Sequence, residues 1–347
     1  MKKVLILGAA GFLGSHLEMR LKQDGCFVVS VARKHPPYGK SVADEYNILD
    51  LTNTPDFHHH FLRHQFDEVY QMAGEVGGLG YIGTGEHDAE ILTNSLKINL
   101  YTLEAMRRTH STAKIFFASS QCVYPDRIEI DPFANERLAE HRMGHHREED
   151  ASFDTFAFGQ EKMFSEKLYD AYARNYGFNI RIGRIGNTYG PYCTWDGDRA
   201  KAPAAIMRKV AQCPYAGTVD LWGDPATTRS FTYVDDVIDG ILRLMKSHYC
   251  QPLNIASGET VTIRELLETT CKVAGKIVGE RWGNGVTGVH ARGSDNTACR
   301  QVLDWEPPTT LLAGIAKTYP WVKEQVERGL TPISDLCSQD GVQTQGA

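Results

Sequence analysis

A glycine-rich turn directly after a buried strand places the strongest constraint on how this chain folds. Residues 4–7 form an apolar run typical of a buried strand, and Gly8, Gly11 and Gly14 follow it at every third position before helical spacing begins. A turn that binds a dinucleotide needs glycines in this arrangement, for a tight bend, a close approach of backbone to pyrophosphate, and close packing of helix on sheet. The N-terminus of the helix then offers N–H groups and a positive dipole to the phosphates. We therefore predict a dinucleotide-binding strand–helix–strand unit at the start of the chain.

The end of the second predicted strand bears on which nicotinamide cofactor such a unit would hold. An acidic residue about 20 residues after the turn usually binds the adenosine ribose diol, but residues 32–34 are Ala, Arg and Lys. Two bases without an acid would suit a 2′-phosphate, or they are simply solvated. We expect NAD and leave NADP open. The predicted cofactor-binding residues are Gly8, Gly11, Phe12, Leu13, Gly14, Arg33, Asp50, Leu51, Ala73 and Lys162.

Strand and helix patterns alternate well beyond this first unit. Apolar runs typical of strands occur at 27–31, 68–72, 114–118 and 179–184, with helical periodicity at 90–108 and 156–176. This alternation predicts an α/β fold, a doubly wound parallel-sheet Rossmann domain. We place that domain at 1–178 and a smaller α/β substrate domain at 179–330, with some of its segments returning to the first. Residues 331–347 are polar and aperiodic, and we expect a disordered tail there.

Charge, cysteine and histidine patterns limit the partners and the location. A formal charge of -6, from 37 basic and 43 acidic residues, argues against a nucleic-acid or membrane-surface binder. No apolar stretch approaches the roughly 20 residues that cross a bilayer. Eight cysteines without a CxxC pair indicate reduced thiols in a cytoplasmic enzyme. The histidine-rich segments 57–60 and 141–146 lack the spacing of metal ligands, so we expect solvated faces and no metal site.

The predicted helix 156–176 carries Phe158 and Lys162 four residues apart, so both side chains lie on one face. Ser119 and Ser120 follow a buried strand. These segments resemble the extended short-chain dehydrogenases/reductases, in which a Ser, a Tyr and a Lys form the catalytic set and the Lys lowers the pKa of the Tyr. The resemblance departs from that pattern at one position, because Phe158 stands where the family has its tyrosine.

Further segments resemble one family within that superfamily, the GDP-mannose 3,5-epimerases. They are the segments 76–82, 119–125, 186–191, 194–205, 228–232 and 292–296, and the similarity extends from about residue 3 to about residue 328. The glycine turn and the segment 228–232 are shared across the superfamily, whereas the surroundings of Cys122 and Lys201 are more selective.

The resemblance implies a redox-neutral epimerisation. A bound nicotinamide oxidises the C4 hydroxyl of the sugar, the C3 and C5 protons become acidic, a base removes one, an acid returns one on the opposite face, and C4 is reduced again. By position, Cys122 matches the base and Lys201 the acid. Taken singly, Cys122 would be an inert buried thiol and Lys201 a solvated charge, but both fall in their family contexts. The predicted catalytic residues are Ser120, Cys122, Phe158, Lys162 and Lys201.

The same resemblance assigns the residues that hold the GDP-sugar substrate. Gly77 and Gly78 would turn backbone N–H groups toward sugar hydroxyls, and an arginine suits a diphosphate because its fork pairs two oxygens. Arg229 or Arg292 would alternatively form a salt bridge between the domains. The predicted substrate-binding residues are Gly77, Gly78, Tyr124, Asn187, Trp195, Lys201, Arg229 and Arg292.

Phe158 leaves three explanations open, because without a phenol there is no obvious acceptor for the C4 hydroxyl proton. The one we favour is a Tyr→Phe substitution, introduced to hold substrate and cofactor unreacted in an otherwise active enzyme. The second is a natural homologue that binds sugar nucleotides without catalysis. The third is that Ser119, Ser120 or Thr155 relays the proton.

Other functions within the superfamily compete with the first. A GDP-4-keto-6-deoxymannose epimerase-reductase uses NADPH and a histidine acid after the Tyr-Gly-Pro segment, but residues 192–203 contain no histidine. An epimerase of another GDP-sugar, such as a GDP-heptose, inverting C3, C5 or both, remains open. The superfamily also implies a homodimer, usually formed by a pair of helices in the first domain.

Overall fold

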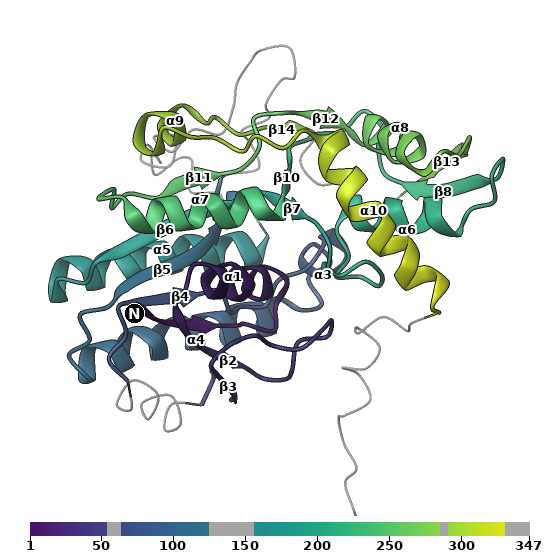
Figure 1. Cartoon of the computed structure of the whole chain (residues 1–347). Helices are drawn as coiled ribbons and strands as arrows, with labels where there is room; N and C mark the ends of the chain where they lie inside the picture. Colours follow the sequence, from purple (N-terminus) through teal and green to yellow (C-terminus); the bar gives the residue numbers. More distant parts are fainter. Residues whose placement is uncertain (54–63, 125–155, 285–290, 330–347) are drawn as a thin grey trace, which may run out of the picture.

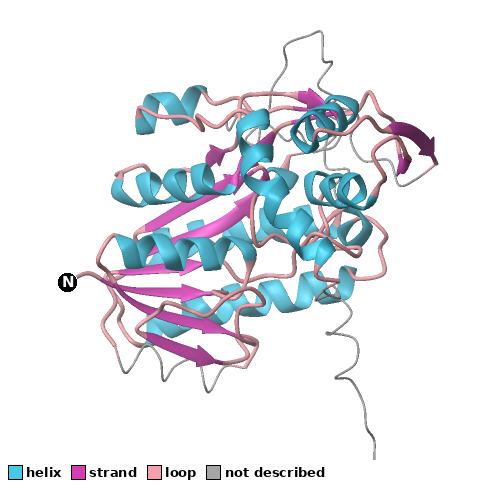
Figure 2. Ribbon diagram, turned by 45° about the vertical axis from the view of Figure 1, so that its right-hand side comes forward, coloured by secondary structure: helices cyan, strands magenta, loops and turns pink. Residues whose placement is uncertain are grey.

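The centre of the molecule is a seven-stranded parallel sheet, which confirms the predicted fold class (Figures 1 and 2). The computed structural model of the 347-residue chain describes residues 1–53, 64–124, 156–284 and 291–329. The strands lie in the order β11-β6-β5-β4-β1-β2-β3, and every neighbouring pair is parallel. Their bounds are β1 Lys3–Leu7, β2 Phe27–Ala32, β3 Glu45–Ile48, β4 Glu68–Gln71, β5 Lys114–Ser120, β6 Ile180–Ile185 and β11 Leu253–Ile255.

The strand order reverses beside β1, which pairs with β2 on one side and β4 on the other. The chain builds outward from β1 to β3 and then returns to build the other half from β4. In open parallel sheets, ligands bind outside the carboxyl ends of the strands at such a switch point. The loops that follow β1 and β4 are therefore the expected borders of a binding site.

Two layers of helices cover the sheet. Helices α4 (Asp88–Arg108) and α5 (Ala157–Tyr176) pack together on one face, and α1 (Phe12–Gln23) and α7 (Val234–Lys246) pack together on the other. Alternate strand residues point to opposite faces. Leu5 and Leu7 accordingly belong to the core under α4 and α5, while Val4 and Ile6 belong to the core under α1 and α7.

A second, smaller body lies beyond the carboxyl edge of the sheet (Figure 1). Its centre is a helical layer of α6 (Ala202–Gln212), α8 (Ile263–Ala274) and α10 (Leu311–Glu327), which pack on one another around a core of their own. The remaining short helices and strands of the described residues are α3 Leu79–Ile82, η1 Gln121–Val123, β7 Asn187–Tyr189, β8 Thr218–Trp222, β9 Thr228–Arg229, β10 Phe231–Tyr233, β12 Val261–Thr262, β13 Gly279–Gly283, β14 Ala291–Arg292 and α9 Thr297–Leu303.

The chain crosses between the two bodies more than once after residue 179. Strands β6 and β11 and helix α7 belong to the central sheet layer, although all three follow the position where we placed the second domain. Conversely, Phe12 and Leu13 at the start of α1 pack against the core of the smaller body. The predicted tail at 331–347 and the histidine-rich segment 141–146 lie outside the described residues, as do His58 to His60. Among the helices that the structure describes, none is both long and apolar enough to cross a membrane.

Candidate functional site

The glycine turn after β1 has the geometry that a dinucleotide requires. Gly8 has a φ of +87°, and its N–H donates to the Val31 carbonyl at 2.8 Å. A Cβ atom on Gly14 would lie 2.2 Å from the Gly8 carbonyl oxygen. Gly11 precedes α1, whose N-terminus has no side-chain cap, so its first N–H groups are not bound by a capping side chain. The residues therefore fit a pyrophosphate at this helix N-terminus.

The other predicted cofactor-binding residues surround this turn at the switch point. A Cβ on Gly8 would come within 2.8 Å of the Ala73 backbone, so the loops after β1 and β4 touch. Asp50 is exposed, and its Oδ1 accepts hydrogen bonds from the N–H and hydroxyl of Thr52 at 2.9 Å. Leu51 is buried in the core instead.

Phe158 and Lys162 lie on the same face of α5, as the spacing predicts. The Lys162 ammonium is 5.6 Å from the centre of the Phe158 ring and 5.1 Å from that of Phe117. It forms an ion pair with Glu161 at 3.3 Å, and both residues are buried. A Cβ on Gly74 would lie 3.4 Å from Lys162 Nζ, which places this lysine against the loop after β4.

The two serines at the end of β5 make different hydrogen bonds. Ser119 is buried and donates a 2.6 Å hydrogen bond to Glu166, a carboxylate that also binds Arg184 through both oxygens. Ser120 accepts a hydrogen bond from the Cys122 N–H at 3.1 Å and caps the short helix η1. Ser119 is therefore fixed in a structural network, whereas Ser120 orients the turn that carries Cys122. Thr155, the third hydroxyl considered above, lies outside the described residues.

Cys122, Arg292 and Lys201 come together although they are far apart in the sequence. Cys122 packs against the apolar cluster of Tyr81, Ile82, Ile91 and Phe158, and the Arg292 guanidinium lies 3.8 Å from its sulfur. Lys201 is at the N-terminus of α6. Burial lowers the pKa of Lys201, and the nearby sulfur atoms of Cys122 and Cys193 partly oppose that shift. A thiol beside one cation and within electrostatic reach of a second is a suitable base, and a lysine of lowered pKa is a suitable acid.

Arg229 and Arg292 occupy paired positions on adjacent strands. Strand β9 pairs with β14, and Arg292 is the direct neighbour of Arg229 in that register. Like charges on neighbouring strands destabilise a sheet. A bound anion between the two guanidinium groups would relieve that cost, and diphosphate matches their hydrogen-bonding fork.

Several of the remaining predicted substrate residues form hydrogen bonds with other groups of the protein. Gly77 and Gly78 are buried, and the Gly78 N–H donates to the Arg199 carbonyl at 3.0 Å. The Tyr124 side chain is buried, and its hydroxyl donates to Asn254 at 2.9 Å. Trp195 is also buried, with its indole N–H donating to Tyr38 at 2.9 Å. Asn187 is half-buried and donates to the Ser230 carbonyl at 3.4 Å. In this structure the polar groups of Gly78, Tyr124 and Trp195 are therefore hydrogen-bonded to other protein groups.

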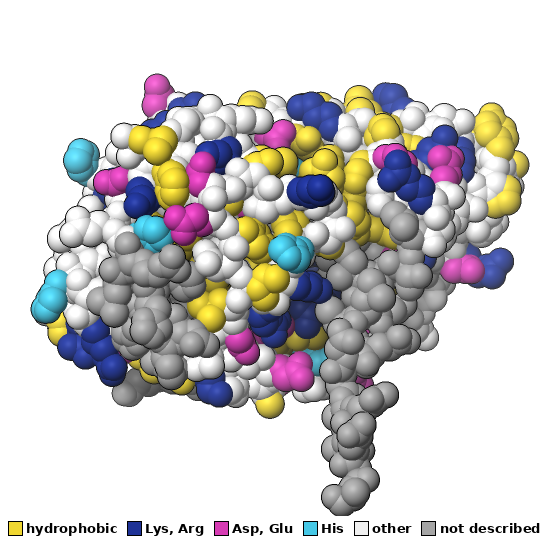
Figure 3. All heavy atoms as spheres, turned by 60° about the horizontal axis from the view of Figure 1, so that its bottom comes forward, with side chains coloured by type: hydrophobic (Ala, Val, Ile, Leu, Met, Phe, Trp, Pro, Cys, Tyr) yellow, Lys and Arg dark blue, Asp and Glu magenta, His cyan; other side chains and the backbone are white. Residues whose placement is uncertain are grey.

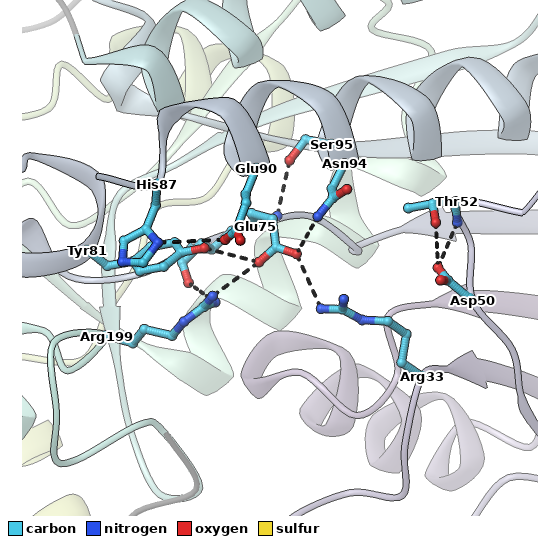
Figure 4. A network of polar contacts seen from close by, with 11 residues as sticks. Arg33, Asp50, Thr52, Glu75, Tyr81, His87, Glu90, Asn94, Ser95 and Arg199 are labelled. Carbon is cyan, nitrogen blue, oxygen red and sulfur yellow. Dashed lines mark hydrogen bonds and ion pairs between the residues drawn. The ribbon is translucent and has the colours of Figure 1, made fainter. Parts of the chain in front are cut away.

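A network around Glu75 was missed by the sequence analysis (Figure 4). Glu75 is buried and follows β4, and its carboxylate accepts hydrogen bonds from Arg33 at 3.3 Å and Arg199 at 3.2 Å. Asn94 and Tyr81 also donate to it, at 3.3 and 3.4 Å. The Arg199 guanidinium lies 3.7 Å from the centre of the Tyr81 ring.

This network joins the cofactor side to the substrate side of the site. Arg33 directly follows β2, where the ribose is expected, and Arg199 stands two residues before Lys201. In the sequence, Glu75 is a single acidic residue between Gly74 and Gly77. Its neighbours in the sequence do not indicate the arginines that it contacts in the structure. On the face drawn in Figure 3, basic side chains lie among exposed hydrophobic ones near the middle of the molecule.

The described residues contain no group of three or more His, Cys, Asp and Glu side chains that would hold a metal ion. The site is therefore described by its thiol, ammonium and guanidinium groups, and by the nucleotide turn beside them.

The chain is similar to known proteins in both sequence and fold. The chain is 34% identical over 336 residues to a GDP-mannose 3,5-epimerase of Arabidopsis thaliana, covering 96% of this chain and 85% of that protein. It is 27% identical over 342 residues to a GDP-L-fucose synthase of Escherichia coli K12, covering 94% and 98%. A UDP-glucose 4-epimerase of Thermotoga maritima, solved with UDP-glucose, has the same fold, with a TM-score of 0.78 at 20% identity over 93% of this chain and 99% of that one. A family model described as NAD dependent epimerase/dehydratase matches residues 4–256. The chain belongs to the NAD dependent epimerase/dehydratase family.

Proposed function

We propose that this chain is a nucleotide-sugar epimerase that inverts C3, C5 or both in a GDP-hexose related to GDP-mannose. The observation that carries the proposal is the meeting of Cys122, Lys201 and Arg292 beside a dinucleotide turn. The similarity to GDP-mannose 3,5-epimerases over nearly the whole chain supports the same conclusion.

The chemistry requires a carbonyl at C4 of the sugar. A C–H bond next to a carbonyl loses its proton more readily because the charge passes to oxygen as an enolate. Cys122 takes the proton from C3 or C5, and Lys201 returns one to the opposite face of the same carbon. The Arg292 guanidinium lies 3.8 Å from the Cys122 sulfur, and the thiolate is the form of a cysteine that acts as a base.

The nucleotide part of the substrate is held by the pair of arginines. Arg229 and Arg292 stand side by side on β9 and β14, and each fork suits two phosphate oxygens. Because Arg292 also contacts Cys122, binding of the diphosphate and placement of the sugar beside the thiol are coupled. We propose Asn187, Gly77 and Gly78 as part of the wall around the sugar.

The cofactor site fits NAD through Gly8, Gly11 and Gly14, with Ala73 and Lys162 on its inner side. When bound, a nicotinamide supplies reversible oxidation of a sugar hydroxyl. Arg33 stays next to the ribose position and pairs with Glu75. In this chain the glycine turn would hold the pyrophosphate, and Asp50 would bind the adenine side of the cofactor.

An exchange experiment tests this function. The Phe158→Tyr variant is incubated with GDP-mannose and NAD in deuterated water, and NMR follows deuterium at C3 and C5 and the configuration of the sugar. We expect exchange in this variant and a loss of about 10²- to 10⁴-fold when Cys122→Ser is added. Cys271→Ser, a half-buried thiol in the smaller body, is the matched control. Exchange that persists without Cys122 would contradict its role.

An epimerase-reductase of the GDP-L-fucose synthase type is the second candidate, supported by similarity over most of the chain. It would consume NADPH in proportion to product. The loop from Tyr192 to Lys201 carries no histidine for the acid, and we propose Lys201 in that role. A binder without catalysis would take up GDP-mannose tightly and show no exchange in any variant.

We further propose that the chain works as a homodimer in the cytoplasm. Helices α4 and α5 pack together on one face of the sheet and expose Leu100 and Phe164, at 40% and 56% of their surface. An apolar side chain exposed on each helix favours a contact between helix pairs of two copies. None of the seven described cysteines forms a disulfide.

A further inference from the structure

The position four residues before Lys162 holds an apolar ring where oxidation of an alcohol would need a base. Phe158 is buried with Tyr81, Ile82 and Ile91 and has Cys122 packed against the same cluster. Its ring is 5.6 Å from the Lys162 ammonium, which is itself paired with Glu161. Removing a hydride from C4 leaves the hydroxyl proton to be accepted by some group, and Phe158 cannot accept it.

The described hydroxyl groups around Phe158 form hydrogen bonds with other residues. Tyr81 donates to Glu75, and burial raises the pKa of Tyr81 to about 12. Tyr124 donates to Asn254, and Ser119 donates to Glu166. Ser120 is oriented by the Cys122 N–H, and a serine does not act as a base without a second base to deprotonate it. Within the described residues, the machinery for alcohol oxidation is therefore incomplete.

The machinery for moving protons on carbon is complete by contrast. Cys122 has the Arg292 guanidinium at its sulfur, and Lys201 stands at the N-terminus of α6 within electrostatic reach of that sulfur. Both residues act on a carbon next to a carbonyl, and neither takes part in hydride transfer. Among the residues that the structure describes, the site thus has groups for proton transfer on carbon and none for accepting the C4 hydroxyl proton.

We propose that this chain epimerises GDP-hexoses that already carry a carbonyl at C4, without oxidising or reducing them. This inference rests on the proposed function and names its substrate class. It accounts for Phe158 without requiring an inactivated enzyme. A reaction that oxidises C4, such as a 4,6-dehydration, must supply the substrate, and a reduction or transamination at C4 must consume the product.

The proposed step balances without an oxidant. The Cys122 thiolate takes a proton from C3 or C5, and the electron pair of that C–H bond becomes an enolate with its charge on the C4 oxygen. The Lys201 ammonium then gives a proton to the other face of the same carbon, and the carbonyl is restored. The thiol and the amine exchange protons with solvent to return to their starting forms, so solvent deuterium enters the product.

The test compares two sugars with the unaltered chain in deuterated water. One is GDP-4-keto-6-deoxymannose, and the other is GDP-mannose with NAD present. We expect deuterium at C3 or C5 of the keto sugar only, a loss of about 10²- to 10⁴-fold in Cys122→Ser, and unchanged exchange in Cys271→Ser. We also expect no NADH absorbance when GDP-mannose is added to the chain with NAD.

The other outcomes separate this inference from the proposed function. Exchange of GDP-mannose by the unaltered chain would overturn the inference, because some group would then serve as the base that Phe158 cannot be. Failure on the keto sugar, with exchange of GDP-mannose by Phe158→Tyr, would also overturn it while leaving the proposed function in place. No exchange of either sugar, by the unaltered chain or by Phe158→Tyr, would overturn both the inference and the proposed function. Circular dichroism must show that both proteins are folded.

Discussion

Lys201 carries a charge in a buried position. We expect the protonation of this one residue to make the rate of deuterium exchange depend on pH. Burial lowers the pKa of its ammonium from the ordinary lysine value of 10.5. The acid role needs the protonated form, so exchange is expected to fall as pH rises through that lowered pKa, before an exposed lysine would lose its proton. The rate of deuterium entry measured across the alkaline range tests this.

The matched variant for this prediction is Lys201→Arg, which keeps the positive charge. A guanidinium does not give up its proton in this range. We expect exchange to be slower by about 10²- to 10⁴-fold and the alkaline decrease caused by lysine to disappear. An unchanged profile in this variant would assign the acid to another group.

Gly14 tests the dinucleotide turn at the same scale. An added Cβ would lie 2.2 Å from the Gly8 carbonyl oxygen, a backbone atom that cannot yield without moving the turn. A backbone shift of this kind costs about 1–3 kcal/mol, so Gly14→Ala should weaken NAD binding by about 5- to 150-fold. Isothermal calorimetry measures the affinity. In Gly283→Ala the nearest atom is at 3.8 Å, and NAD affinity equal to that of the parent is expected.

At the scale of elements, the Glu75 network fixes the loop that carries Lys201 to the end of β4. The Glu75 carboxylate binds Arg199 and Arg33, and the Gly78 N–H binds the Arg199 carbonyl. Glu75→Gln keeps the shape and removes the charge that both arginines need. We expect exchange to be slower by up to about 10²-fold, the loss that a misplacement of about 1 Å causes, with a smaller change in the Michaelis constant.

A purely structural role for Glu75 would lower stability and leave the pH profile of exchange in place. A positioning role is expected to shift the alkaline decrease as well, because Lys201 then changes its surroundings. Glu75→Asp, which keeps the charge, should recover part of the rate. Thermal unfolding measured for both variants separates loss of folding from loss of positioning.

Glu104 provides a control on the far side of the first domain. It binds Arg107 and the Tyr172 hydroxyl, and these contacts lower its pKa to about 2. Because its pKa is lowered in the folded state, its stabilisation is present above the ordinary value of 4.5 and is lost as pH falls toward 2. Glu104→Gln should cost about 1 kcal/mol in urea unfolding at pH 7, less below pH 4.5, and exchange should be unchanged.

The sequence predicted the elements that carry local signals, and the structure supplied the contacts between them. Buried runs and the glycine turn predicted β1, α1 and the parallel sheet because periodicity and turn chemistry are local properties. The face shared by Phe158 and Lys162 followed from helical spacing in the same way. The Glu75 network and the pairing of Arg229 with Arg292 depend on strands and loops that are distant in the sequence. No local sequence pattern therefore predicts them.

The division into domains shows the same limit. The chain enters the smaller body after β6, returns for α7 and β11, and leaves again, so no single boundary in the sequence separates the two. Strand β6 was predicted as a strand from its apolar residues. Its place in the central sheet follows from pairing with β5 and β11, which only the fold determines.

At the scale of the whole molecule, the exposed apolar residues on α4 and α5 predict how two copies associate. Phe164 is 56% exposed on α5 and Leu100 is 40% exposed on α4. A charge introduced into an apolar interface is left without water or a partner. Phe164→Glu is therefore expected to convert a dimer into a monomer, as measured by size-exclusion chromatography with light scattering.

Tyr215→Glu is the matched control, because Tyr215 is 62% exposed in the turn between α6 and β8, away from α4 and α5. This variant should remain dimeric. Both variants should retain deuterium exchange per chain, since Arg292 contacts Cys122 and Lys201 interacts electrostatically with Cys122 within one chain. If the parent is a monomer, the two copies do not associate. If the dimer survives Phe164→Glu, the contact between copies lies on another face.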